Sequence, residues 1–205
     1  GVSLQKFNYF PDTSVIPNVM MASRLLIDKG VKEFYEAAVL LKHAKLQANF
    51  VLVGETDSDN PASISDDLIE KWMHENIVEF WGHRADMQNV LPRASIVVLP
   101  SYREGFPKVL IEAAACGRPV ITTDVPGCRD AIYNNKTGIL VPPRNVKALA
   151  DAIKNLILDN DARQMMGSEA RKMSEIRFDE KFVIKKHLHI YNQLLESAKK
   201  TVIEN

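Results

Sequence analysis

The 205-residue sequence predicts an α/β fold, in which helices cover both faces of a parallel β-sheet. Two observations support this prediction. Short apolar runs recur along the chain, and segments with helical apolar spacing separate them. Because the runs are almost continuously apolar, they are typical of strands buried on both faces of a sheet, and parallel strands require crossover connections between them.

Six of these runs are expected to form strands. Each is short, rich in aliphatic residues and followed by a glycine, a proline or a polar loop that ends the extended segment. The expected strands are residues 15–23, 49–53, 77–81, 95–99, 119–123 and 138–141.

Between and after the strands, apolar residues recur every three or four positions, as in amphipathic helices. Val31, Phe34 and Leu41 show this spacing, and Asn145 is suited to cap the helix that follows it. The expected helices are residues 30–41, a segment after 65 that includes Leu68 and Trp72, then 86–93, 107–116, 127–134, 145–158, 160–175 and 179–200. The sequence thus predicts a Rossmann-like domain over residues 15–175, a linker over 1–14 that leads into it, and a C-terminal helix within 176–205.

Composition and charge exclude several classes of protein. Lysine plus arginine and aspartate plus glutamate number 26 each, so no overall charge favours nucleic acid as a partner. No apolar run approaches a membrane span, and no signal peptide is recognisable. Cys116 and Cys128 are too few for a disulfide framework, which predicts reduced thiols in the cytosol. The opening Gly1-Val-Ser-Leu is unlike a natural start and suggests a fragment of a longer chain.

Two cations follow the first predicted strand. Arg24 comes directly after it, and Lys29 stands just before Gly30 and the next helix. In sheets of this kind, ligands bind beyond the ends of the strands, where cations beside a helix start suit a diphosphate. On their own, the two side chains would be interpreted as solvated loop residues.

A second group of candidates surrounds the helix predicted after the fourth strand. Glu104 precedes this helix and Glu112 lies in its second turn. The loop carboxylate of Glu104 has an alternative partner in Arg103 or Lys108. Glu112 is surrounded by apolar residues and could pair only with Lys108 along the helix, so it needs a further polar partner.

The start of the same helix has the residues expected at such a turn. Gly105 permits a positive φ, and Pro107 suits the first helical position. The amide N–H groups of Phe106, Lys108 and Val109 are expected to be free to bind phosphate or sugar oxygens.

The ends of the second and third strands add three more candidates. Gly54 ends the second strand, and His83 and Arg84 follow the third. A lone histidine is more often a surface or packing residue than a catalyst. No cluster of His, Cys and Asp has metal-ligand spacing, so we expect no metal site.

Residues 100–119 (PSYREGFPKVLIEAAACGRP) resemble the Glu-x7-Glu signature of family 4 retaining glycosyltransferases, whose GT-B architecture has two facing Rossmann-like domains. Residues 24–30 (RLLIDKG) match the Arg-Leu-x-x-x-Lys-Gly of the same family, although Ser23 replaces the usual preceding glycine. The resemblance covers about residues 15–200 and corresponds to the donor-binding, C-terminal half of such an enzyme.

The resemblance implies a role for each candidate. Arg24 and Lys29 would hold the pyrophosphate of a nucleotide sugar and stabilise the leaving nucleoside diphosphate, while Glu104 would bind the donor sugar. Glu112 would bind the ribose hydroxyls. The loop of His83 and Arg84 would contact the base, and Gly54 would line the same cleft.

The function implied is retaining transfer of a hexose or N-acetylhexosamine, from UDP in our expectation, to a glycan or lipid-linked acceptor in bacterial polysaccharide synthesis. The resemblance further implies no cofactor or metal, and a cytoplasmic location with peripheral contact at the inner face of the membrane. The acceptor would be held by an N-terminal domain absent from these residues, so the fragment alone would be inactive. The C-terminal helix would cross to that domain. A sugar-nucleotide 2-epimerase and a non-catalytic nucleotide-binding module remain alternatives.

Overall fold

The computed structural model describes residues 1–57 and 59–203, with side chains up to residue 195; residues 204–205 of the predicted tail lie outside it. Six parallel strands form one sheet in the order β3-β2-β1-β4-β5-β6. This confirms the predicted α/β fold. The strands are β1 (Asn18–Ala22), β2 (Asn49–Val53), β3 (Glu79–Gly82), β4 (Ile96–Leu99), β5 (Val120–Thr123) and β6 (Gly138–Val141).

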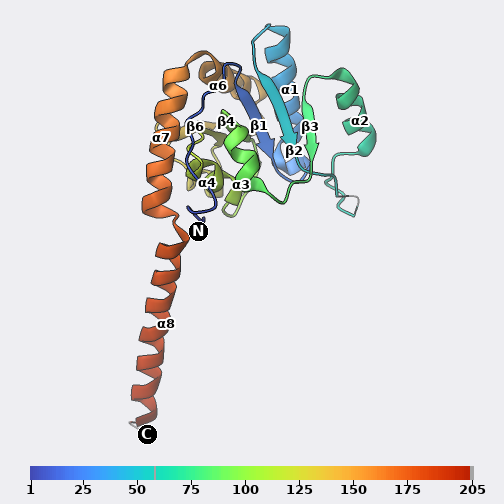
Figure 1. Cartoon of the computed structure of the whole chain (residues 1–205). Helices are drawn as coiled ribbons and strands as arrows, with labels where there is room; N and C mark the ends of the chain where they lie inside the picture. The colour runs from blue at the N-terminus through green and yellow to red at the C-terminus, as the bar shows by residue number, and fades with distance from the viewer. Residues whose placement is uncertain (58, 204–205) are drawn as a thin grey trace.

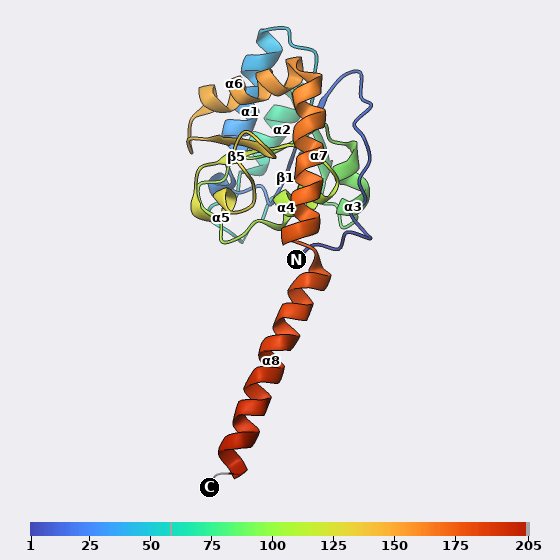
Figure 2. The ribbon, with the colours of Figure 1, turned by 90° about the vertical axis from the view of Figure 1, so that its left-hand side faces the viewer.

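Helices cover both faces of this sheet (Figures 1 and 2). Helix α1 packs with α6 and α4 with α7. The α-helices are α1 (Val31–His43), α2 (Asp66–Glu75), α3 (Met87–Val90), α4 (Lys108–Ala115), α5 (Pro126–Arg129), α6 (Val146–Leu158), α7 (Asn160–Arg177) and α8 (Glu180–Ile203), and two 3-10 turns are η1 (Ile27–Lys29) and η2 (Leu91–Arg93).

Most predicted elements lie where the sequence placed them. Asn145 caps α6 as predicted, because its side chain accepts a hydrogen bond from the amide of Ala148. Among the bounds that differ, β1 begins at Asn18 rather than residue 15, β3 begins at Glu79 rather than residue 77, and the helical turn expected at 127–134 is α5, which ends at Arg129.

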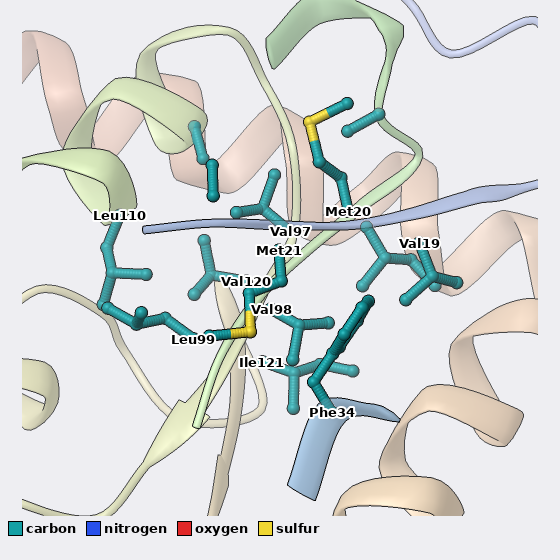
Figure 3. Packing of buried hydrophobic residues seen from close by; sticks show 14 of the residues in the cluster. Val19, Met20, Met21, Phe34, Val97, Val98, Leu99, Leu110, Val120 and Ile121 are labelled. Carbon is teal, nitrogen blue, oxygen red and sulfur yellow. The ribbon is translucent and has the colours of Figure 1, made fainter. Parts of the chain in front are cut away.

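The central strands carry the core (Figure 3). All four residues of β4 and of β5 are buried: β4 is a continuous apolar run, whereas β5 ends in the buried threonines Thr122 and Thr123. Phe34 of α1 and Leu110 of α4 contribute to the same core, and each has 0% exposure. Cys116 and Cys128 are buried and free, and burial raises the pKa of the Cys116 thiol to about 12.

The strand order creates a switch point beside β1. The chain leaves β1 to form β2 on one side, while β4 pairs with β1 on the other: Met21 is in register with both Leu52 and Val98. The loops that follow β1 and β4 therefore meet at the edge where these strands end, called the carboxyl edge here. Ligand sites of open parallel sheets lie at such a point.

Residues 1–14 lie against the domain. The amide of Val2 donates to the carbonyl oxygen of Phe178 at 2.7 Å, and the amide of Glu180 donates to that of Val2 at 3.0 Å. Val2 and Phe7 are buried. The predicted linker is thus anchored beside the junction of α7 and α8, while the division of the chain into domains stays a prediction.

Helix α8 extends away from the body of the molecule (Figures 1 and 2). Its apolar residues Ile184, Leu188, Tyr191 and Leu195 are all more than half exposed. Whether this helix crosses to another domain stays a prediction. Among the described residues, no helix is both long and apolar enough to cross a bilayer.

Candidate functional site

Two hollows open at the carboxyl edge, one of about 340 Å³ and one of about 390 Å³. Together they contain most of the predicted site residues. The first hollow is lined by Ala22, Ser23, Arg24, Val53, Gly54, Glu55, His83, Arg84, Met87, Val109 and Glu112. The second hollow is lined by Asp28, Lys29, Arg103, Glu104 and Gly105.

Lys29 and Glu104 form an ion pair in the second hollow. Lys29 Nζ lies 2.7 Å from Glu104 Oε1, and the two side chains are only 17% and 13% exposed. Glu104 therefore pairs with neither alternative partner considered from the sequence. Arg103 Nε instead lies 3.5 Å from Asp28 Oδ2.

A close backbone approach brings Lys29 to this position. Gly30 has φ of 76°, and a Cβ there would lie closer than 3.0 Å to the carbonyl oxygen of Pro100. Only glycine allows both the positive φ and the close approach. The amide of Tyr102 donates to the carbonyl oxygen of Asp28 at 2.8 Å, which ties the two loops together.

Arg24 lies in the first hollow, not beside Lys29. Its side chain is 63% exposed, and Nη1 lies 3.6 Å from Asp57 Oδ2. The structure thus places the two predicted phosphate cations in different hollows, each already facing a carboxylate. Removing either carboxylate would increase the net positive charge available to an anionic ligand.

Glu112 lines the first hollow, and its carboxylate makes no hydrogen bond to the described part of the chain. Burial raises the pKa of this carboxyl group above its ordinary value, and attraction to Lys108 opposes the rise. A half-buried carboxylate without a donor suits a ligand that supplies hydroxyl groups. That Glu112 binds such a ligand stays a prediction.

Helix α4 begins one residue later than predicted. Pro107 is its N-cap with extended backbone, and the helix starts at Lys108. Within the described chain, the amide N–H groups of Phe106, Lys108 and Val109 make no hydrogen bond, as predicted, so they remain available to a ligand.

Gly105 does not adopt the positive φ that a glycine permits. It is not among the glycines with positive φ, and a Cβ there would meet no atom within 4 Å. The turn therefore does not depend on a left-handed residue at this position. Phe106 turns its ring away to Phe178, which it meets edge to face with ring centroids 5.6 Å apart.

The three candidates after β2 and β3 meet at the first hollow. His83 Nδ1 lies 3.4 Å from Glu55 Oε1, and both side chains are more than half exposed. Arg84 donates two hydrogen bonds of 2.8 Å to the carboxylate of Asp86, so its guanidinium already has a partner. Gly54 has φ of 146°, and a Cβ there would lie closer than 3.0 Å to Ser23 O.

Sequence reasoning missed three residues that shape the hollows. Met87 lines the first, Asp57 faces Arg24, and Asp28 lines the second. Nothing in the sequence pattern distinguishes these residues from other loop residues, because their importance comes from neighbours distant in the chain. No group of three or more His, Cys, Asp or Glu side chains that could hold a metal occurs in the described residues.

Comparisons with known proteins identify similar sequences. A family model described as "Glycosyl transferases group 1" matches residues 15–173. A Campylobacter jejuni protein named N,N'-diacetylbacillosaminyl-diphospho-undecaprenol alpha-1,3-N-acetylgalactosaminyltransferase is 36% identical over 89% of this chain and 46% of its own length. The capsular polysaccharide biosynthesis glycosyltransferase CapM of Staphylococcus aureus is 30% identical over 85% of this chain and 46% of its own length. The chain thus spans about half the length of these curated relatives.

Solved structures share the fold. Sucrose-phosphate synthase from Thermosynechococcus elongatus is 26% identical with a TM-score of 0.81, covering 96% of this chain and 52% of that one. Anabaena HepE in complex with UDP is 24% identical with a TM-score of 0.78, covering 96% and 56%. The C-terminal domain of a Francisella tularensis group 1 glycosyl transferase is 24% identical with a TM-score of 0.74, covering 88% and 100%. The last two likenesses concern the fold alone.

Proposed function

The chain belongs to the group 1 glycosyltransferases, and from that membership we propose that it binds a nucleoside diphosphate sugar at its carboxyl edge, as the donor-binding part of a retaining glycosyltransferase. One observation carries the proposal. Arg24, Glu112 and Val109 line one hollow and Lys29 lines another, and both hollows lie at the edge where the loops after β1 and β4 end. Cations and helix N–H groups suit the diphosphate, and an unpaired carboxylate suits hydroxyl groups.

In this proposal, Arg24 and Lys29 bind the diphosphate together with the amides of Phe106, Lys108 and Val109. Each cation faces a single carboxylate in the free chain, and a diphosphate carries more negative charge than either. The ligand therefore competes with Glu104 for Lys29.

Glu112 accepts hydrogen bonds from the ribose hydroxyls. The first hollow beside it has an apolar wall that includes Met87 and Val109, while His83 lies on its polar side. We propose that the base binds in this hollow. UDP is the proposed nucleotide, as the resemblance to the family implies.

The proposed chemistry needs no nucleophile from the protein. The bond between the sugar's anomeric carbon and the diphosphate breaks, and the acceptor oxygen bonds to that carbon on the same face. The acceptor's proton passes to an oxygen of the leaving phosphate, whose negative charge Arg24 and Lys29 stabilise. These cations serve in place of a metal ion, so no metal or other cofactor is part of the proposal.

The sugar and the acceptor are proposed from the relatives' names. An N-acetylhexosamine or hexose is the transferred group, and a glycan or lipid-linked saccharide of bacterial polysaccharide synthesis is the acceptor. The acceptor site belongs to the half of the relatives' length that this chain does not span. We therefore expect this chain alone to bind donor without turnover. We also propose that the reaction takes place in the cytoplasm, at the inner face of the membrane.

The test is calorimetric titration of the chain with UDP, GDP and ADP. We expect UDP to bind, and the Arg24→Ala/Lys29→Ala variant to lose roughly 1.5–3 kcal/mol per charge-assisted contact. Lys147→Ala removes one exposed cation whose partner is Asp151 on α6, so it serves as the matched control. If neither this chain nor the full-length protein binds any of the three diphosphates, the proposal is wrong. Sugar transfer catalysed by this chain alone would contradict the expectation that it binds donor without turnover.

A further inference from the structure

The loop after β5 approaches the site although sequence reasoning gave it no role. It leads into α5, a single turn in which Gly127 is buried. A Cβ on Gly127 would lie closer than 3.0 Å to the carbonyl oxygens of both Glu104 and Gly105, a separation that real Cβ atoms do not show. Gly127 has no positive φ, so space and not backbone freedom explains the glycine.

A hydrogen bond ties the same two loops together. The hydroxyl group of Thr123, at the end of β5, donates to the carbonyl oxygen of Ser101, at the start of the loop that carries Glu104. Ser101 Oγ in turn lies 3.0 Å from the carbonyl oxygen of Asp28, beside Lys29. Thr123 and Ser101 are both buried. The end of β5 is therefore hydrogen-bonded to the loop after β4, which is hydrogen-bonded in turn to the loop after β1.

We propose that Gly127 is a positioning residue, which lets the first turn of α5 press against the backbone of Glu104 and Gly105 and so holds Glu104 against Lys29. The contact involves backbone atoms of all three residues, so it sets the position of the loop and not merely a side-chain conformation. Any side chain at position 127 displaces the loop by pushing on the two carbonyl groups. Glu104 then leaves Lys29, and both change position in the second hollow.

The consequence for ligands rests on the proposed function. If Glu104 binds the donor sugar, displacing it weakens binding of UDP-sugar but not of UDP. Lys29 released from Glu104 becomes more available to a diphosphate. A general loss of stability would weaken binding of both ligands alike, so the ratio of the two affinities separates positioning from unfolding.

A second glycine provides a matched control. Gly167 lies in α7, and a Cβ there would lie closer than 3.0 Å to the carbonyl oxygen of Gly117, with no positive φ. Gly167→Ala therefore introduces the same kind of backbone clash between α7 and the turn after α4, away from both hollows. Its stability loss should be similar to that of Gly127→Ala, while its site should be unchanged.

The experiment compares the wild-type chain with Gly127→Ala, Gly127→Val and Gly167→Ala. Nuclear magnetic resonance follows the Lys29 ammonium group and the amides of residues 103–106 without any ligand. Calorimetry follows UDP, UDP-glucose and UDP-N-acetylgalactosamine. Gly127→Ala should shift these signals and lower the UDP-sugar affinity about tenfold or more, because misplacement by about 1 Å has large effects, with UDP affinity unchanged or higher. Gly127→Val should have a larger effect, and Gly167→Ala should change neither.

Two outcomes overturn the proposal: unchanged Lys29 and loop signals in Gly127→Ala, or the same change in Gly167→Ala. If the position-127 variants do not fold, Thr123→Val decides instead, because it adds no bulk but removes the hydrogen bond to Ser101. Shifted Lys29 signals in Thr123→Val support the proposal that the loop after β5 positions Glu104 against Lys29, and unchanged signals overturn it. If neither the wild-type chain nor the full-length protein binds nucleotide, the proposed function fails, while the ligand-free signals still test the positioning.

Discussion

Lys29 Nζ lies 2.7 Å from Glu104 Oε1, so a cation after β1 and a carboxylate after β4 hold each other across the switch point of the sheet. The two residues were assigned to different parts of a donor, the diphosphate and the sugar. Because of this ion pair, the charge of Lys29 is already balanced by Glu104 when no ligand is bound. A diphosphate must replace the carboxylate as the partner of Lys29, or share Lys29 with it.

Glu104→Gln should therefore raise the affinity for UDP. The change keeps the shape of the side chain but removes the charge that competes for Lys29, and the gain should be on the order of fivefold, or about 1 kcal/mol. Calorimetric titration measures it, and Glu36→Gln on the exposed face of α1 is the control. A lower affinity for UDP would mean that Glu104 orients Lys29 for the phosphate instead of competing with it.

Asp57→Asn should act in the same direction through Arg24. These two side chains are exposed and 3.6 Å apart, so their pairing contributes roughly 0–1 kcal/mol to folding. The thermal midpoint should barely move, while the affinity for UDP rises because a negative charge beside the first hollow is gone. Added salt should reduce the difference between variant and wild type. If the affinity stays the same at low salt, Asp57 lies too far from the bound diphosphate to matter.

Glu112→Gln should make stability less dependent on pH. Burial raises the pKa of Glu112 above its unfolded value of about 4.5. The folded state therefore binds the proton more tightly than the unfolded state, and wild-type stability falls as pH rises from the unfolded pKa through the folded one. The glutamine variant lacks this loss, so it should be more stable than wild type at pH 7 and similar at pH 4.

Thermal unfolding between pH 4 and 8 measures this difference, and Glu36→Gln again serves as control. The same Glu112→Gln variant should bind UDP more weakly, since the amide accepts ribose hydroxyl hydrogen bonds less strongly than a carboxylate. A variant less stable than wild type at pH 7 would show that Glu112 has a stabilising partner in the free protein.

Gly54→Ala should strongly destabilise the chain. A Cβ at this position clashes with the carbonyl oxygen of Ser23, and φ of 146° is unfavourable for any residue with a side chain. We expect a loss of about 3 kcal/mol or more in urea unfolding.

Gly82→Ala provides the comparison, because φ there is 64° but no atom lies within 4 Å of the added Cβ. Gly82→Ala should lower the free energy of unfolding only by the cost of placing a side chain on left-handed backbone, roughly 1 kcal/mol. Equal losses in the two variants would mean that the strand ends relax to admit the side chain, and that Gly54 is not required for the close approach of β1 and β2.

Much of the fold could be predicted because its signals are local. Strand β4 is fully buried, so its sequence is apolar without alternation, and Asn145 marks the start of α6. The bounds of β3 were less clear, since this edge strand is only partly buried and its sequence is mixed. The turn at α5 was misplaced because a four-residue helix leaves little periodicity to detect.

The candidate site was predicted as a set of residues but not as an arrangement. Arg24, Lys29, Glu104 and Glu112 all follow β1 or β4, and a parallel sheet brings the ends of neighbouring strands to one edge whatever the loop details. Gly105 permits a positive φ, but the turn does not use it. Gly30, Gly54 and Gly127 matter because they lack a side chain, and at each of them an added Cβ would clash with backbone from elsewhere in the chain.

The sequence by itself determined the fold class, the strands and the residues that follow each strand, because burial and helical periodicity are written in neighbouring positions. Only the tertiary structure decided that Lys29 pairs with Glu104, that Arg24 faces Asp57, and that Gly127 of α5 lies against the backbone of Glu104. These relationships depend on loop positions set by contacts between segments many residues apart. The local spacing of residues does not predict such contacts. It can therefore identify the groups at the site but not which of them form pairs.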